Sequence, residues 1–175
     1  MKKLIFTIVL SMSGIGAFAQ DIDFGVKAGV NFANFSGKNN SSETTTGFYL
    51  GGFAEIDISE KFQVQPELLY SSEGASFKVG DNDPTVSFLR LPIMAKYMIY
   101  ENLDLVAGPQ LGVMLDDKNF DFNTFDLGLG TGLAYELDNG LGFDLRYNFG
   151  FMNLSKVEGV TLNQNNLMFG LNYEF

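Results

Sequence analysis

The side chains that could do chemistry in this chain are carboxylates and a few cations, placed at alternate positions along apolar segments. The cations are Lys27, Arg90, Lys96 and Arg146. The acids are Glu55, Asp57, Glu67, Asp104, Asp126, Glu136, Asp144 and Glu174. A pair of carboxylates could do general acid–base work, and a row of them could line an ion path. The alternative, which we favour, is a set of salt bridges that fills the interior of the fold.

The composition removes most catalytic chemistry. The chain has no Cys and no His, so it lacks disulfides, thiolate ligands, a thiol nucleophile and the commonest general base. Its 21 acidic residues outnumber its 11 Lys and Arg residues, and so acidic a chain repels nucleic acid. We therefore expect no cofactor, no metal site and no nucleic-acid partner.

Two short patterns could be taken for binding sites. Gly128-x-Gly130-x-Gly132 is similar to a nucleotide-binding loop, but it lies within an alternating segment and no helical pattern follows it. We expect these glycines to leave room for neighbouring side chains. The acids of 81–83 and 116–117 could offer oxygen ligands to a divalent cation, although solvated loop acids explain them as well.

The elements that must position these residues are strands. Eight segments alternate apolar and polar residues, which puts successive side chains on opposite faces of a strand. The segments are 24–32, 48–58, 62–71, 89–99, 103–113, 125–137, 141–151 and 166–175. Three short connections, 59–61, 100–102 and 138–140, alternate with longer polar ones at 36–46, 74–85, 116–124 and 155–164. Short turns that alternate with long loops are typical of bacterial outer-membrane barrels.

The two faces of these segments differ in bulk and in charge. One face is bulky and nearly free of charge over roughly 9–11 residues, the length with which a tilted strand spans a bilayer. The other face is rich in glycine and carries charges of both signs. The sequence therefore predicts an all-β fold: an eight-stranded, antiparallel, up-and-down transmembrane β-barrel. We expect it to be a monomer, with its apolar faces turned outward to the lipid bilayer.

The first residues predict export. Lys2 and Lys3 precede the apolar run 4–10, and Ala17-Phe18-Ala19 has the small-x-small form of a signal-peptide cleavage site. We therefore expect a signal peptide over 1–19 and a barrel domain over 20–175. Cleavage leaves 9 basic against 21 acidic residues. An uncleaved anchor is the alternative.

Four stretches carry a resemblance to a known family. They are FLRLPIMAKY at 88–97, VAGPQLG at 106–112, DLGLGTG at 126–132 and LRYNFG at 145–150. In these stretches the chain resembles the small outer-membrane β-barrel proteins of the porin-family or PorT-like kind. The resemblance implies the fold and a location in the outer membrane of a Gram-negative bacterium. It does not imply one shared activity.

The end of the chain is similar to an assembly signal. Its last five residues, LNYEF, include Leu171, Tyr173 and the terminal Phe175. In the family that the chain resembles, a C-terminal signal ending in Phe is recognised by the outer-membrane assembly machinery. The resemblance therefore implies this machinery as a partner during biogenesis.

For function, the sequence favours a non-enzymatic barrel with a structural or interaction role, which presents polar external loops to an unknown partner. A narrow channel for small solutes or ions is the alternative. The enzymes among barrels of this membrane resemble one another in using a His, which this chain lacks.

A network of charges is predicted to close the lumen. Counting from the short turns puts Lys27 level with Glu55, and Glu67 close to Lys96. Cross-strand neighbours of opposite sign attract each other, so we expect these pairs within one connected network low in the lumen. The predicted members are Lys27, Glu55, Glu67, Arg90, Lys96, Asp144 and Arg146.

The export route is testable at both ends of the chain. N-terminal sequencing of protein from the membrane fraction is expected to begin at Gln20, because cleavage after Ala19 removes the signal peptide. Deletion of Phe175 is expected to reduce the heat-modifiable folded band on gels. A sequence that begins at Met1 would contradict the predicted cleavage. An unchanged folded band would contradict the predicted assembly signal.

Overall fold

The protein is an antiparallel β structure throughout its described residues. The computed structural model describes residues 22–37, 44–74, 85–115, 125–152 and 162–175. The strands are β1 (Ile22–Gly37), β2 (Thr45–Ser59), β3 (Phe62–Gly74), β4 (Thr85–Tyr100), β5 (Leu103–Met114), β6 (Phe125–Glu136), β7 (Leu141–Gly150) and β8 (Leu162–Glu174). In these ranges, no helix is long and apolar enough to cross a membrane.

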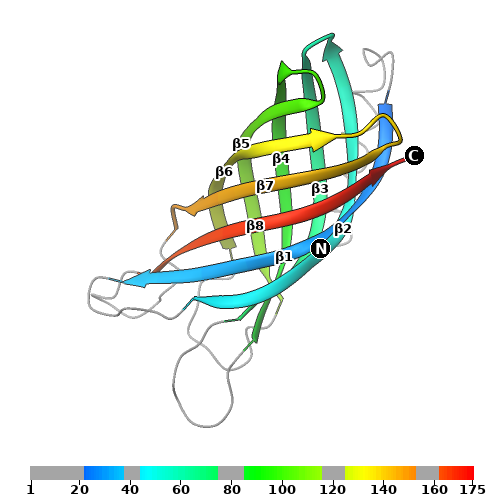
Figure 1. Ribbon diagram of the computed structural model, residues 1–175. Helices are drawn as coiled ribbons and strands as arrows, with labels where there is room; N and C mark the ends of the chain where they lie inside the picture. The colour runs from blue at the N-terminus through cyan, green and yellow to red at the C-terminus, as the bar shows by residue number, and fades with distance from the viewer. Residues whose placement is uncertain (1–21, 38–43, 75–84, 116–124, 153–161) are drawn as a thin grey trace, which may run out of the picture.

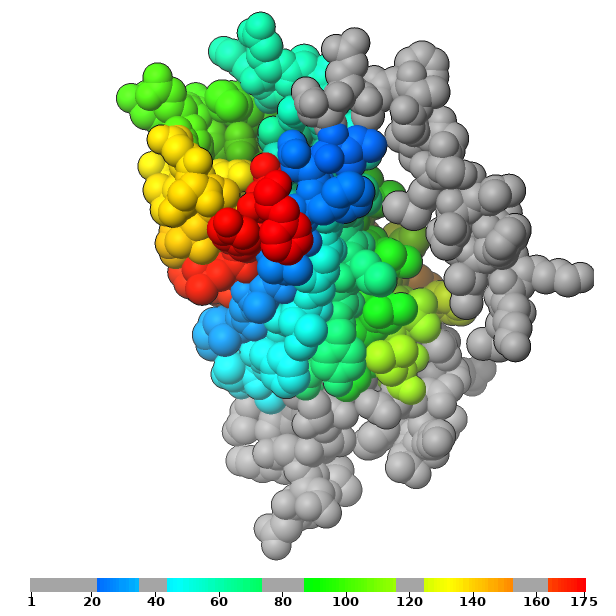
Figure 2. All heavy atoms as spheres, turned by 90° about the vertical axis from the view of Figure 1, so that its right-hand side faces the viewer, coloured from blue at the N-terminus to red at the C-terminus, as the bar shows by residue number. Residues whose placement is uncertain are grey.

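The sheet closes on itself. Each strand pairs with its sequence neighbours, and β8 pairs with β1 to complete a barrel (Figure 1). This last pairing runs from Gly25 opposite Glu174 to Gly37 opposite Leu162, and Figure 2 shows the C-terminal end of β8 against β1. Closure gives every strand a partner on both edges, as lipid requires, because lipid cannot hydrogen-bond a free backbone. The predicted eight-stranded up-and-down barrel is confirmed.

Tight turns join the strands at one end of the barrel, in the upper right of Figure 1, and we call this the turn end. Asn102, between β4 and β5, has a φ of 64°, and its side-chain amide donates to the Glu136 carbonyl at 2.6 Å. Gly140, between β6 and β7, has a φ of 80°. Asn and Gly are the residues that adopt this left-handed conformation most readily. The opposite end is called the loop end below.

Several strands continue further toward the loop end than the alternation predicts. β1 extends to Gly37 rather than to 32, and β4 begins at Thr85 rather than at 89. Backbone pairing continues here although the side chains no longer alternate, because alternation marks the lipid-facing part of a strand and not its hydrogen bonds. The acids of 81–83 and 116–117 lie outside the described residues.

The apolar faces point away from the lumen. Leu91, Ile93, Leu129 and Phe143 are 41, 51, 41 and 38 % exposed, which confirms the outward orientation predicted for them. On β4 the apolar outer face runs from Leu89 to Ile99, which corresponds to roughly 25 Å for a strand tilted by about 40°. That height matches the apolar band of outer-membrane barrels.

Exposed aromatic side chains mark both borders of this apolar band. Those near the turn end are Tyr97, Tyr100, Tyr135, Tyr173 and Phe175. Those toward the loop end are Phe48, Tyr70, Phe125 and Phe151. Aromatic girdles of this kind lie at the membrane–water interfaces. Their positions therefore define the part of the barrel that lipid surrounds.

A charge in the apolar band is expected to destabilise the barrel. Leu129→Arg, on the outer face of β6, is expected to cost about 2–4 kcal/mol, because the guanidinium would lie in hydrocarbon. The matched control is Leu137→Arg, in the turn after β6, where the expected cost is about 0–1 kcal/mol. Urea unfolding in phospholipid vesicles measures both. Equal losses would contradict the assigned lipid face.

Candidate functional site in the barrel lumen

The polar faces of the strands turn inward and place charges at three heights, nearly all of them buried. The loop-end group is Glu73, Arg90 and Asp126; the middle group is Lys27, Glu67, Asp144 and Arg146; the turn-end group is Glu55, Lys96, Asp104 and Glu136. An eight-stranded barrel has an interior just wide enough to be filled by side chains. The three groups are therefore the candidate functional site.

Glu67 is the centre of the middle group. Its carboxylate accepts hydrogen bonds from Lys27 Nζ at 3.0 Å and from Gln65 Nε2 at 2.6 Å. It also accepts from Arg146 Nη1 at 2.9 Å and from Nη2 at 2.6 Å, a two-pronged pairing of the strong kind. These donors neutralise a carboxylate that is fully removed from solvent.

Asp144 completes the middle group. Its Oδ1 lies 3.4 Å from both Lys27 Nζ and Arg146 Nε, and the Tyr49 hydroxyl donates to its Oδ2 at 3.4 Å. Two cations thus face two carboxylates. Because a buried unpaired charge is expensive, this balance is what allows the group to lie in the lumen.

Arg90 organises the loop-end group. Its Nε donates to Glu73 Oε1 and its Nη2 donates to Glu73 Oε2, both at 2.7 Å. Its Nη1 donates to Asp126 Oδ2, also at 2.7 Å. Gln164 accepts from Nη2 at 3.1 Å and donates to Glu73. Ser71 also donates to Glu73, at 2.8 Å. Here one cation faces two carboxylates.

The turn-end group is the most acidic. Lys96 Nζ lies 2.5 Å from Glu55 Oε2, 3.4 Å from Glu136 Oε2 and 3.8 Å from Asp104 Oδ2. Carboxylate oxygens of Glu55, Glu136 and Glu174 all lie within 4.8 Å of one another. Glu136 and Glu174 are only partly buried, so water at the barrel mouth can screen their charges.

The predicted pairing of the charges is wrong. Lys27 contacts Glu67 rather than Glu55, and Lys96 contacts Glu55 rather than Glu67. The network is also not gathered low in the lumen, because Arg90 lies toward the loop end. The prediction compared neighbouring strands, whereas these side chains reach across the lumen: Lys27 is on β1, Glu67 on β3 and Arg146 on β7.

Glycines on the adjacent strands lie opposite three of the buried cations. Gly51 is opposite Lys27, Gly132 is opposite Arg146 and Gly112 is opposite Arg90. A Cβ atom at position 112 would lie 2.9 Å from Arg90 Nη1. The three glycines at 128, 130 and 132 lie within β6, on its lumen face, as predicted.

Sequence reasoning missed one lumen acid and several apolar lumen residues, among them Phe53, Leu69 and Phe88. Glu73 is fully buried and binds Arg90, but the predicted strand stopped at 71. It continues the alternate series of Gln65 and Glu67, which is the signal that could have found it. The buried apolar side chains in the lumen include Tyr49, Phe53, Leu69, Phe88, Met94 and Met168.

Comparison with known proteins places this geometry in a family. Residues 18–156 match a family described as outer membrane protein β-barrel domain. The chain belongs to this family. It is therefore an outer-membrane β-barrel, embedded in the lipid bilayer of the bacterial outer membrane. In such barrels the short turns face the periplasm and the longer loops face outward.

Solved structures share the fold at low sequence identity. Neisserial surface protein A aligns with a TM-score of 0.63 at 18% identity, over 89% of this chain and 100% of its own. Ail of Yersinia pestis, in a phospholipid bilayer nanodisc, aligns with a TM-score of 0.55 at 16% identity, over 89% of this chain and 100% of its own. A chain from a de novo design of transmembrane β-barrels aligns with a TM-score of 0.50 at 12% identity, over 87% of this chain and 95% of its own. A search of curated protein sequences finds no significant match.

Loss of one cation from the middle group is expected to destabilise the barrel strongly. Arg146→Met leaves Glu67 and Asp144 with Lys27 alone, and breaking a buried pair in this way costs about 3–5 kcal/mol. Urea unfolding in vesicles measures the loss. Adding Glu67→Gln to that variant restores the charge balance and is expected to recover part of the lost stability. Full stability of Arg146→Met would contradict the pairing.

Proposed function

We propose that the protein is a non-enzymatic barrel whose lumen is closed by the middle group, and that it acts through its structure and its external loops. The observation that carries this proposal is the position of Glu67 between Lys27 and Arg146. These three residues come from β3, β1 and β7, so their side chains meet across the lumen.

The packing around the middle group supports a closed lumen. The side chains of Lys27, Glu67 and Arg146 are at most 3 % exposed. Tyr49, Leu69 and Met168 form a buried apolar cluster on the lumen faces of β2, β3 and β8. Because an eight-stranded barrel has room for side chains and little more, such a layer leaves no continuous water path.

The chemistry of the middle group supports a non-enzymatic role. Glu67 accepts hydrogen bonds from Lys27, Arg146 and Gln65, so it is not free to take a proton from a substrate. The chain has no Cys or His to act as a nucleophile or base. The proposed activity is therefore recognition or envelope stabilisation.

The charge of the chain limits the kind of partner. Ail has been solved in complex with the heparin analogue sucrose octasulfate. After the expected cleavage, the chain has 9 basic against 21 acidic residues. Such an excess repels polyanions, so we propose a neutral or cationic partner for the external loops instead.

Biogenesis is proposed to follow the route of other outer-membrane barrels. A signal peptide over 1–19 would direct export, and the assembly machinery would recognise Leu171, Tyr173 and Phe175. All three side chains are exposed on the outer face of β8 or just after it. Because β8 closes the barrel against β1, recognition there would precede closure. We propose that the folded protein is a monomer, since closure leaves no free strand edge.

Planar-bilayer recording tests the closed lumen. The wild-type barrel is expected to show no steady single-channel conductance. The double variant Glu67→Ala/Arg146→Ala is expected to show small, resolvable openings, because it shortens both side chains that meet across the lumen and removes one charge of each sign. The control Glu60→Ala, in the exposed turn between β2 and β3, is expected to stay silent. Steady conductance from the wild-type protein would overturn the proposal in favour of a channel.

A further inference from the structure

Three of the four prolines of the chain lie within adjacent strands of the barrel wall. Pro66 is on β3, Pro92 on β4 and Pro109 on β5. Proline has no backbone N–H, so within a sheet it removes one ladder hydrogen bond and is normally confined to edge strands. A closed barrel has no edge strand, so each of these prolines leaves one backbone carbonyl of a neighbouring strand without its donor.

The pairing of the strands is interrupted at each of these prolines. The pairs missing from the register are Ala54 with Pro66 between β2 and β3, Glu67 with Pro92 between β3 and β4, and Ile93 with Pro109 between β4 and β5. Within the described residues, the pairing at the other five strand interfaces has no such gap. The carbonyls of Ala54, Glu67 and Ile93 are therefore the ones that lose their ladder donor.

The gaps lie side by side within the apolar band. Pro66 is directly opposite Ile93, whose other neighbour in the sheet is Pro109. We call Ala54, Pro66, Ile93 and Pro109 the proline row. Ile93 and Pro109 are exposed on the outer face, where lipid offers a free carbonyl no donor. Strand pairing is therefore weakest at this level of the wall.

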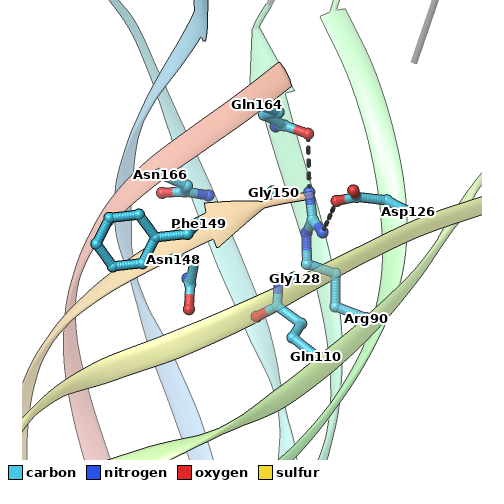
Figure 3. Close-up of a pocket in the computed structure, with 9 residues that line it drawn as sticks. All are labelled: Arg90, Gln110, Asp126, Gly128, Asn148, Phe149, Gly150, Gln164 and Asn166. Carbon is cyan, nitrogen blue, oxygen red and sulfur yellow. Dashed lines mark hydrogen bonds and ion pairs between the residues drawn. The ribbon is translucent and has the colours of Figure 1, made fainter. Parts of the chain in front are cut away.

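The lumen is incompletely filled behind the same part of the wall. Pro92, Gln110, Gly128 and Gly150 follow one another across β4 to β7, one position from the proline row. Gly128 and Gly150 carry no side chain, and a cavity of about the size of a water molecule lies beside them and Gln110 (Figure 3). The wall therefore has free space behind it as well as fewer hydrogen bonds within it.

The middle group ties this weak wall to the opposite one. Glu67 is on β3, and its carboxylate is held by Lys27 of β1 and by Arg146 of β7. The backbone carbonyl of the same residue is one of the three without a ladder donor. The ion pairs of Glu67 therefore hold β3 in place where its own pairing is weakest.

We propose that the wall of β3, β4 and β5 opens locally at the proline row, and that the ion pairs of Glu67 act as its latch. Separating the strands costs least here, because each interface begins one hydrogen bond short. Opening at this level joins the lumen to the hydrocarbon of the bilayer rather than to water at either end. The backbone pairing that carries this proposal is independent of whether the lumen conducts ions.

Amide hydrogen exchange of the full barrel, followed by NMR in phospholipid nanodiscs, tests the weak wall. After correction for intrinsic rates, the amides of Glu67 and Ile93 are expected to exchange about fivefold faster, or more, than those of Leu145 and Phe169. A factor of about five is the equilibrium effect of one hydrogen bond. Leu145 and Phe169 are opposite each other on β7 and β8, where the pairing is uninterrupted.

Two variants of β5 assign the difference. Pro109→Ala adds the missing donor opposite Ile93 and is expected to slow exchange there about fivefold. The matched control is Leu111→Ala, at the next outward-facing position of β5, which shortens a side chain and adds no donor. It is expected not to slow the exchange of Ile93. Equal exchange in the two walls, or a difference that Pro109→Ala leaves unchanged, would overturn the proposal.

The latch is tested in the variant Arg146→Met, or in Lys27→Met if the first does not assemble. Exchange is expected to accelerate more at Glu67 and Ile93 than at Phe169. Adding Pro92→Ala is expected to reverse part of the change at Glu67, because it supplies a donor to the carbonyl of that residue. A uniform acceleration at all three amides would overturn the latch, since it would show that the cation stabilises the whole barrel alike.

Discussion

The pairing of β1 with β8 is the constraint on which the rest of the structure depends. It satisfies the backbone hydrogen bonds at the two edges of the sheet, so the whole ladder can lie in lipid. It also fixes the number of strands at eight, and this number sets the width of the lumen. A lumen so narrow must be filled by side chains, because there is no room for a separate plug.

The narrow lumen determines which side chains can meet. Arg146 on β7 reaches Glu67 on β3, on the far side of the barrel. Glycines lie opposite Lys27, Arg90 and Arg146, and Gly112 leaves room for the Arg90 guanidinium. At Arg90, a glycine on the next strand therefore makes room for a buried charge. The buried rings of Tyr49 and Phe53 fill the space that charges leave.

Charge is distributed unevenly along the barrel axis. The middle group is balanced, whereas the loop-end and turn-end groups each have more carboxylates than cations. In the balanced middle group the side chains are almost fully removed from solvent, where an unpaired charge would be costly. At the turn end, Glu136 and Glu174 are partly exposed, so water can offset part of the excess charge there. This balance supports the proposal that side chains seal the barrel at its centre.

The sequence by itself determined the strands, their faces and the membrane location, because a period of two in apolar residues is a local property that lipid selects directly. It also showed that Lys27, Glu67 and Arg146 point inward. Only the tertiary structure decided their partners, and the pairing expected between neighbouring strands was wrong for Lys27 and Lys96. Contacts across a lumen depend on the tilt, stagger and closure of the whole sheet, which no local pattern encodes. The burial of Glu73 was missed for the related reason that backbone pairing continues where the lipid-facing alternation ends.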